Sequence, residues 1–329
     1  MTSKTRVALA LGSGGARGYA HIGALEVLRE RDFEVVTIAG TSMGALVGGV
    51  AAAGVLDEYA EWARALTQRD ILRLLDPTIS APGAFRAAKI LAKVNELLDG
   101  AQIEDLPIPF TAVATDLNAR REVWFQRGPV DVAIRASIAI PSVITPVMIN
   151  GRLLVDGGLM NPVPIEPTVA VVADLTVAVS LSGVPATPAP ASPLKESSEP
   201  RPREEWAERL RRGAAGLLDA DRFRALSGRL ATVRRAANGA EAGTAEELEA
   251  HAPTTLEALP GEIGVRDLLN MSFDTMSALI TRYRMASMPP DVLVTIPVNS
   301  CRTMDFHRAS EMIALGRSLT IDALERAGY

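Results

Sequence analysis

Ser42 stands in a sequence context that could make it a nucleophile. It is the central residue of Gly40-Thr41-Ser42-Met43-Gly44. A mostly apolar run, residues 35–39, precedes this pentapeptide, and a run of small helix-forming residues follows it. This pattern predicts a strand, a tight turn and a helix. A serine at such a turn is forced into a strained backbone conformation that exposes its hydroxyl, and the flanking glycines let strand and helix approach closely. The pentapeptide alone can arise by coincidence, but its context favours a nucleophile elbow.

A glycine-rich loop lies upstream of this serine. The expected strand Val7–Leu11 runs into Gly12-Ser13-Gly14-Gly15-Ala16-Arg17-Gly18, and a helix is expected from about residue 19 to 31. A dinucleotide-binding G-x-G-x-x-G pattern fails in both frames, because Arg17 and Ser13 stand where glycine is required. The loop can still present backbone N–H groups to a negative oxygen, either of a phosphate or of a reaction intermediate. Beside an exposed serine such donors suit acyl transfer, with Gly14 and Gly15 as the first candidates.

Arg17 of this loop has two candidate functional roles. Its guanidinium could hold the shape of the loop, or it could contact an anionic group of a substrate. The simplest alternative is a solvated arginine on the first turn of the following helix.

A serine nucleophile needs a base, and Asp156 is the first candidate. It opens the sequence Asp156-Gly157-Gly158, directly after a hairpin that Asn150-Gly151 predicts. On its own, Asp-Gly-Gly is most simply a turn in which the carboxylate bonds to local backbone. A Ser-Asp dyad therefore requires that Asp156 be desolvated and within hydrogen-bonding distance of Ser42.

The second arrangement is a Ser-His-Asp triad. The chain has three histidines. His307, with Asp291, could complete a triad, whereas His21 is expected to pack or cap in the helix after the glycine loop and His251 lies in a low-complexity segment. No loop pattern supports the triad, so the dyad is the simpler hypothesis.

Composition restricts the class of protein. The chain has 329 residues, of which 48% are hydrophobic, so it can bury a large core. Its net charge of −5 and the lack of a basic stripe with interleaved aromatic residues argue against a nucleic acid partner. The single cysteine, Cys301, excludes an intrachain disulfide framework and a cysteine-based zinc site, and it suits a reducing cytoplasm.

Two segments imitate targeting signals. Lys4 and Arg6 precede the apolar residues 7–11, but this run is too short for a signal peptide and Arg17 follows it. The uncharged span 35–56 is long enough to imitate a membrane helix. Its five glycines fit the strand, turn and helix better. We expect a protein that is cytoplasmic or peripherally associated with a membrane.

Four motifs together resemble the patatin-like phospholipases. The glycine loop together with the following helix that includes His21, the pentapeptide around Ser42, the sequence RASIAIP at residues 135–141 and the Asp-Gly-Gly at 156–158 occur in the order and spacing of that family. The resemblance is strongest to its bacterial branch, which is related to the catalytic domain of neuropathy target esterase. It covers residues 5–182 and, more weakly, 263–329.

This resemblance implies both a fold and a reaction. The fold would be α/β, with three α/β/α layers around a central, mostly parallel sheet. The reaction would be hydrolysis of lipid acyl esters by a Ser42–Asp156 dyad, with no metal and no cofactor. The resemblance also implies an oxyanion hole from the glycine loop, formed by Gly14, Gly15, Ala16 and Arg17. The glycines that support these motifs are Gly12, Gly18, Gly40, Gly44, Gly157 and Gly158.

The sequence differs from the compact form of the family by an expected insertion, residues 183–262. This insertion divides the expected catalytic domain into residues 1–182 and 263–329. The insertion opens with a proline-rich linker, VPATPAPASPLKESSEPRPR, and then carries apolar residues at helical spacing. Residues 201–235 contain ten arginines against five acidic residues. Such a basic amphipathic helix could contact an anionic membrane, or pack as a lid or a dimer arm. The acidic residues 238–262 predict a second linker.

Two other classes of function remain open at this stage. In one, the protein is a catalytically weak membrane-binding or regulatory member of the family, and the basic helix is its functional element. In the other, the glycine loop binds a nucleotide.

Overall fold

A mixed sheet of eight strands forms the centre of the structure. The computed structural model describes residues 4–74, 87–184 and 265–329. Among these residues the strand order is β5-β6-β3-β2-β1-β7-β8, and β4 pairs with β3 outside this path. The strands are β1 (Arg6–Leu11), β2 (Glu34–Thr41), β3 (Phe110–Asp116), β4 (Arg121–Phe125), β5 (Val147–Ile149), β6 (Arg152–Asp156), β7 (Leu175–Gly183) and β8 (Val292–Pro297).

The middle of this sheet is parallel and one edge is antiparallel. Parallel pairs join β1 to β2, β1 to β7, β2 to β3 and β7 to β8. Antiparallel pairs join β3 to β4, β3 to β6 and β5 to β6. The hairpin between β5 and β6 turns at Asn150 and Gly151, whose φ angles are 51° and 75°. These positive angles are those of the tight two-residue turn that the Asn-Gly sequence predicts.

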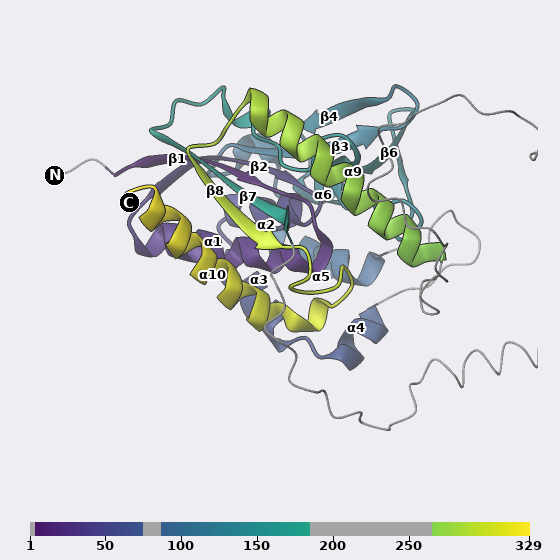
Figure 1. Ribbon diagram of the computed structural model, residues 1–329. Coiled ribbons are helices and arrows are strands. Elements are labelled where there is room, and N and C mark those ends of the chain that lie inside the picture. The colour runs from purple at the N-terminus through teal and green to yellow at the C-terminus, as the bar shows by residue number, and fades with distance from the viewer. Residues whose placement is uncertain (1–3, 75–86, 185–264) are drawn as a thin grey trace, which may run out of the picture. The chain divides into compact units, whose positions relative to one another are not determined.

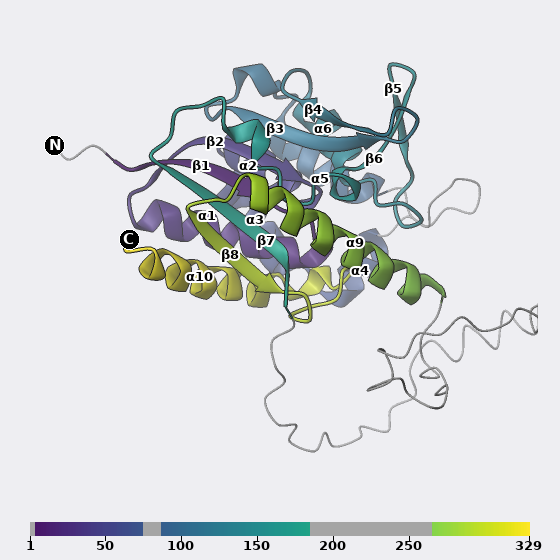
Figure 2. The same ribbon diagram turned by 45° about the horizontal axis from the view of Figure 1, so that its top comes forward.

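Helices cover both faces of the sheet (Figures 1 and 2). In the views of Figures 1 and 2, α9 crosses one face, while α1, α2 and α10 lie on the other. The fold is therefore the three-layer α/β/α arrangement that the sequence motifs predict. The helices are α1 (Ala20–Glu30), α2 (Met43–Ala52), α3 (Leu56–Ala65), α4 (Gln68–Leu74), α5 (Ala88–Leu98), α6 (Val130–Ser137), α9 (Val265–Ser287) and α10 (Ala309–Arg326).

The core divides between the two faces because neighbouring side chains of a strand point to opposite sides. In β1, Leu9 and Leu11 join the large apolar cluster that includes residues of α1, α2 and α10. Ala10, between them, joins a smaller cluster that is covered by Met285 of α9 and by Met288, which directly follows this helix. Leu9 and Leu11 are fully buried, and each such leucine stabilises the fold by about 2 kcal/mol.

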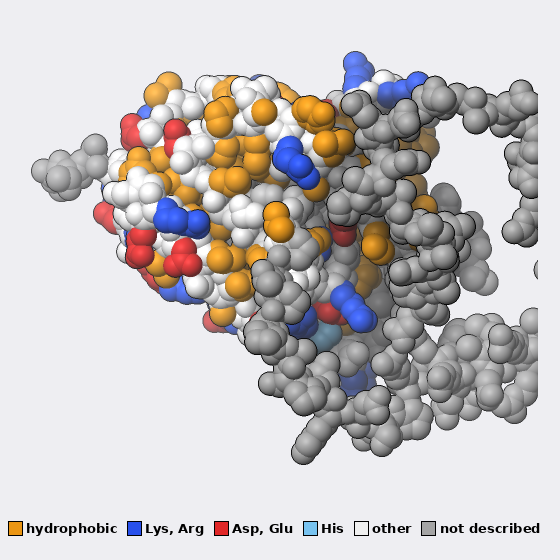
Figure 3. Space-filling model, in the orientation of Figure 1, with side chains coloured by type: hydrophobic (Ala, Val, Ile, Leu, Met, Phe, Trp, Pro, Cys, Tyr) orange, Lys and Arg blue, Asp and Glu red, His pale blue; other side chains and the backbone are white. Residues whose placement is uncertain are grey.

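Helix α9 is the main element that the sequence analysis does not predict. Its apolar residues do not form one buried stripe, because several of them are exposed. These are Leu268, Leu269, Met271, Met276, Leu279 and Tyr283. Figure 3 shows the face of the molecule that carries α9, where hydrophobic side chains are spread among polar and charged ones. A single apolar face, which is the usual signal of a packed helix, is therefore lacking.

Several sequence-based predictions fall on residues outside the described ranges. They are the basic helix in 201–235, the linkers on either side of it and His251. The limits of the 183–262 insertion likewise stay a prediction. Within the three described ranges, no helix combines the length and the apolar character needed to cross a lipid bilayer.

Candidate active site

Ser42 lies in a sharp turn between the end of β2 and the start of α2. Its backbone angles are φ 57° and ψ −123°, a region that costs a residue with a side chain about 1–3 kcal/mol. Both glycines of the pentapeptide are required by close contacts. A Cβ on Gly40 would lie 2.2 Å from the carbonyl oxygen of Gly44, and a Cβ on Gly44 would lie 2.1 Å from that of Leu11. The local geometry is the strained strand–turn–helix that the sequence predicts.

The turn is held by Ser137, at the end of α6. The backbone N–H of Ser42 donates to Ser137 Oγ at 2.8 Å, and the Ser137 hydroxyl donates to the carbonyl of Val113 at 2.6 Å. All three residues are buried. The sequence analysis includes Ser137 in the RASIAIP motif but assigns it no role. Its hydroxyl ties the strained turn to β3.

Asp156 lies next to Ser42 although 114 positions separate them. Strand β3 lies between their two strands, with Val113 opposite Thr41 and Ala114 opposite Asp156. This register brings Ser42 Oγ to 2.5 Å from Asp156 Oδ2, and the hydroxyl donates to the carboxylate. Both residues are buried, with 3% and 5% of their surface exposed. The distance that the dyad hypothesis requires is therefore present.

The environment of Asp156 makes its carboxyl group more basic than usual. Its Oδ1 accepts a hydrogen bond from the N–H of Gly158 at 2.7 Å. Burial raises the pKa of Asp156 from 3.8 to about 6, against the hydrogen bonds from Ser42 and Gly158, which favour the charged form. The carboxylate is thus ionised at neutral pH and still able to accept a proton.

The glycine loop leaves two of its backbone donors unused. Among the described residues, no acceptor bonds to the N–H of Gly14 or Gly15. Gly15 lines the same pocket as Ser42, and its φ of 58° is one that glycine adopts easily. A Cβ on Gly15 would also lie 2.5 Å from Thr303. The loop therefore presents free N–H groups where the sequence analysis expects them.

Ala16 and Arg17, the two other predicted members of the oxyanion hole, form hydrogen bonds within the protein. The N–H of Ala16 donates to the carbonyl of Thr303 at 2.9 Å, which contradicts the expectation that it is available to a substrate. Arg17 is buried, with 4% of its surface exposed. Its Nη1 donates to the carbonyl of Val298 at 2.7 Å and its Nη2 lies 3.6 Å from Asp274. Its side chain thus holds the loop in place.

Among the described residues, no histidine forms a hydrogen bond with Ser42 Oγ or with the Asp156 carboxylate. His21 is fully buried and bonds through Nε2 to the carbonyl of Gly12 at 2.8 Å, and burial lowers its pKa to about 4. It is a neutral anchor of the glycine loop. Asp291, the other member of the triad hypothesis, accepts from the N–H of Thr176 at the amino end of β7. Ser42 follows the carboxyl end of β2, so a triad with His307 and Asp291 is not assembled.

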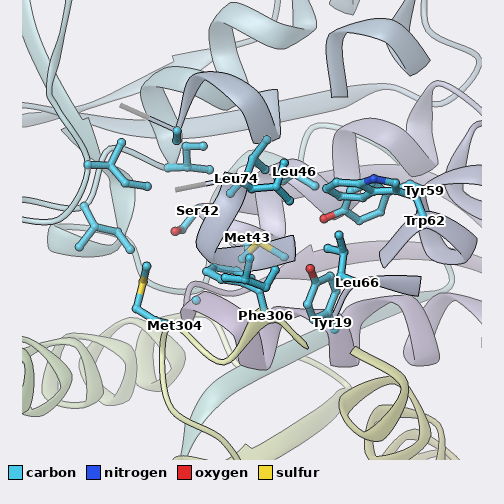
Figure 4. A pocket seen from close by; sticks show the side chains of 17 residues that line it. Tyr19, Ser42, Met43, Leu46, Tyr59, Trp62, Leu66, Leu74, Met304 and Phe306 are labelled. Carbon is cyan, nitrogen blue, oxygen red and sulfur yellow. The ribbon is translucent and has the colours of Figure 1, made fainter. Parts of the chain in front are cut away.

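Ser42 lines an apolar pocket (Figure 4). Met43 and Leu46 of α2 form one wall, and Tyr19, Tyr59 and Trp62 lie at the end away from Ser42 in this view. The other residues that line it are Gly15, Leu66, Ile71, Leu74, Ala87, Ile90, Ile138, Ile140, Ile144, Met304 and Phe306. No charged side chain is among the described residues of its wall. The pocket therefore suits a hydrocarbon chain rather than a polar group.

The described residues were also compared with the side-chain groupings that bind metal ions. Within the described part of the chain, no three His, Cys, Asp or Glu side chains are grouped so that they could hold a metal ion. The chemistry available to the site described above is that of a hydroxyl, a carboxylate and backbone N–H groups.

Comparison with known proteins places this site in a family. The family model for patatin-like phospholipases matches residues 9–169, which include the glycine loop, Ser42 and Asp156. The chain belongs to the patatin-like phospholipase family.

Two sequence relatives agree with this assignment. An NTE family protein of Mycobacterium tuberculosis is 50% identical over 98% of this chain and 92% of that protein. Human patatin-like phospholipase domain-containing protein 6 is 32% identical over 49% of this chain, but the matched part is 12% of that protein. The crystal structure of VipD from Legionella pneumophila is more distantly similar, with a TM-score of 0.44 and 13% identity over 98% of this chain and 67% of that one.

Proposed function

We propose that this protein is a serine hydrolase that cleaves acyl esters of lipids. The observation that carries the proposal is the 2.5 Å contact between the Ser42 hydroxyl, which lines an apolar pocket, and the buried Asp156 carboxylate. Membership of the patatin-like phospholipase family supports a lipid as the substrate. The apolar pocket supports a hydrocarbon chain as the part of the substrate that enters the protein.

The proposed reaction has two steps. Asp156 takes the proton of the Ser42 hydroxyl as the oxygen attacks the acyl carbonyl carbon, and the protonated Asp156 then returns this proton to the departing alcohol. The product of this step is an acyl ester on Ser42. Water then attacks the acyl ester while Asp156 takes one of its protons. Asp156 returns this proton to Ser42 Oγ as the acyl–oxygen bond breaks, which releases the fatty acid and the free serine.

The glycine loop is proposed to stabilise the negative charge that forms on the carbonyl oxygen. The free N–H groups of Gly14 and Gly15 are the proposed donors, and the amino end of α2 adds a positive partial charge next to Ser42. One such donor accelerates acyl transfer by about 10²–10³-fold. Because these donors are fixed backbone groups, they need no rearrangement when the charge develops.

The proposal is tested by analysing lipid products by mass spectrometry. Phospholipids, lysophospholipids and acylglycerols are each incubated with the wild-type protein and with the Ser42→Ala variant. We expect fatty acid release from at least one class with the wild type alone. Equal and negligible release by both proteins from all three classes would contradict a lipid acyl hydrolase.

The pH dependence of the reaction follows from the raised pKa of Asp156. Only the ionised carboxylate can accept the serine proton, so protonation below its pKa of about 6 removes the base. We expect kcat/KM for an uncharged ester to rise as the pH increases through about 6 and to level off above it. The measurement is kcat/KM for p-nitrophenyl butyrate between pH 4.5 and 8. A profile that stays flat down to pH 4.5 would contradict Asp156 as the base.

The pocket wall at Leu46 gives a prediction about substrate length. Leu46 is buried and lines the pocket between Ser42 and the aromatic end. A Leu46→Phe substitution adds volume there, and we expect it to lower the ratio of kcat/KM for p-nitrophenyl laurate to that for p-nitrophenyl butyrate by about tenfold. Leu25→Phe is a matched control, because Leu25 is also buried but borders a separate groove with Lys4 and Arg29. Equal ratios in both variants would show that the acyl chain does not lie along Leu46.

A further inference from the structure

Helix α9 contacts the loops around Ser42 through one of its faces. Asp274 lies 3.6 Å from Nη2 of Arg17 in the glycine loop, and the Ser277 hydroxyl donates to the carbonyl of Gly158 at 3.3 Å. Arg284 lies two turns further along the helix. Spacings of three and seven residues place these three side chains on the same side of the helix. One helix thus bonds to the glycine loop and to the turn that carries Asp156.

Arg284 bridges two carboxylates that come from different elements. It forms ion pairs with Glu122 of β4 and with Glu166, the latter at 2.6 Å. The side-chain amide of Asn161 lies between the same two acids, and its Nδ2 donates to Glu122 at 3.0 Å and to Glu166 at 3.1 Å. The two glutamates carry two negative charges, and Arg284 supplies the positive charge that holds them together around Asn161.

The backbone of Asn161 is bonded to both sides of the reactive pair. Its carbonyl accepts from the Thr41 hydroxyl at 2.8 Å, and its N–H donates to the carbonyl of Gly157 at 2.9 Å. Thr41 directly precedes Ser42, and Gly157 directly follows Asp156. Asn161 is fully buried, so it has little freedom to move without displacing one of these neighbours.

We infer that Arg284 is a positioning residue for the Ser42–Asp156 pair and acts through Glu122, Glu166 and Asn161. The inference rests on the proposed function of the pair. Arg284 is not among the described residues that line the pocket, so its effect falls on the reaction step and not on binding of the acyl chain. Without its charge the two glutamates repel each other at close range, Asn161 loses its fixed orientation, and the contact between Ser42 and Asp156 loosens.

Steady-state kinetics of Arg284→Met test this inference. We expect kcat for p-nitrophenyl butyrate to fall by about 10- to 100-fold, with KM changed less than about twofold, because a displacement of about 1 Å at a reacting group can cost 10²-fold. Arg284→Lys keeps one positive charge and should recover part of the loss. Adding Glu166→Gln to Arg284→Met removes one of the repelling charges, so the double variant should be more active than the single one.

Arg282→Met is the matched control on the same helix. Arg282 is exposed and forms no hydrogen bond or ion pair within the described residues, so we expect wild-type kinetics. Titration of active sites with a fluorophosphonate corrects every kcat for the fraction of folded protein. A corrected kcat of Arg284→Met equal to that of Arg282→Met would overturn the inference.

Hydrogen exchange separates this inference from the proposed function. Peptides that cover residues 40–44 and 156–161 should exchange faster in Arg284→Met than in Arg282→Met, whether or not the protein hydrolyses the ester. Equal exchange in both variants would contradict the positioning role. Faster exchange in Arg284→Met than in Arg282→Met, together with a wild-type protein that hydrolyses no ester, would contradict the proposed function alone.

Discussion

Replacing Ser42 by alanine is expected to lower kcat/KM for p-nitrophenyl butyrate by at least about 10⁴-fold, which is the scale of loss when a serine nucleophile is removed. The hydroxyl is the group that forms the acyl ester, and within the described residues no other hydroxyl bonds to Asp156. Alanine also removes the hydrogen bond to the carboxylate but leaves the strained turn in place. The measurement is ester hydrolysis at pH 8 with protein whose folding is checked by circular dichroism.

The control for this variant is Ser137→Ala. Ser137 donates to Val113 and accepts from the backbone of Ser42, so its loss should weaken the turn but keep the nucleophile. We expect a much smaller loss of activity from this variant. Residual activity of Ser42→Ala within tenfold of the wild type would show that another residue performs the attack.

Replacing Asp156 by asparagine is expected to lower kcat/KM by about 10³- to 10⁴-fold while the protein stays folded. Asparagine has almost the same shape and can still accept from the N–H of Gly158, but its amide cannot take the proton of Ser42. Loss of a catalytic carboxylate that acts with a serine costs about this much. Hydrolysis of p-nitrophenyl butyrate at pH 8 is the readout.

The direction in which Asp156→Asn changes the stability of the protein follows from the raised pKa of Asp156. Because the pKa of Asp156 is raised from 3.8 to about 6 in the folded protein, ionisation disfavours folding as the pH rises through this interval. Above pH 6 the cost is on the order of 3 kcal/mol. Asparagine avoids it, so the thermal midpoint of Asp156→Asn at pH 8 should be no lower than that of the wild type. A large fall in the thermal midpoint of Asp156→Asn would mean that the variant loses activity because it unfolds.

His307→Ala distinguishes the dyad from a triad. Asp291 accepts a hydrogen bond from Thr176 at the amino end of β7, whereas Ser42 follows the carboxyl end of the parallel strand β2. We therefore expect His307→Ala to keep nearly full activity. A loss comparable to that of Asp156→Asn would restore the histidine-based hypothesis.

The turn at Ser42 was predictable from sequence because its causes are local. A strand, a strained serine between two glycines and a helix of small residues lie within 20 consecutive positions, and each part has a pattern of its own. The hairpin at Asn150-Gly151 was predictable for the same reason. Asp156 could be nominated as the base by its position after that hairpin and by resemblance. Its contact with Ser42 depends on the pairing of both strands with β3, which no local pattern specifies.

The parts that the sequence did not predict depend on contacts between distant residues. In the sequence, nothing distinguishes the N–H of Ala16 from the other N–H groups of the glycine loop, but in the structure it donates a hydrogen bond to the carbonyl of Thr303. The roles of Ser137 and Asn161 follow from hydrogen bonds to residues that are distant in the sequence, including Ser42 and Thr41. Helix α9 has polar residues on the face that contacts these loops and exposed apolar residues elsewhere, so its pattern does not match that of an ordinary packed helix.

The rate at which a fluorophosphonate labels Ser42 tests the central claim most directly. The reagent reacts with a serine that a neighbouring base activates, and mass spectrometry of peptides identifies the labelled residue. The account predicts one adduct, on the peptide that contains Ser42, and labelling of the Asp156→Asn variant that is at least about 10³-fold slower at pH 8. Labelling of Asp156→Asn at the wild-type rate, or a wild-type protein that stays unlabelled at Ser42, would contradict a nucleophile activated by Asp156.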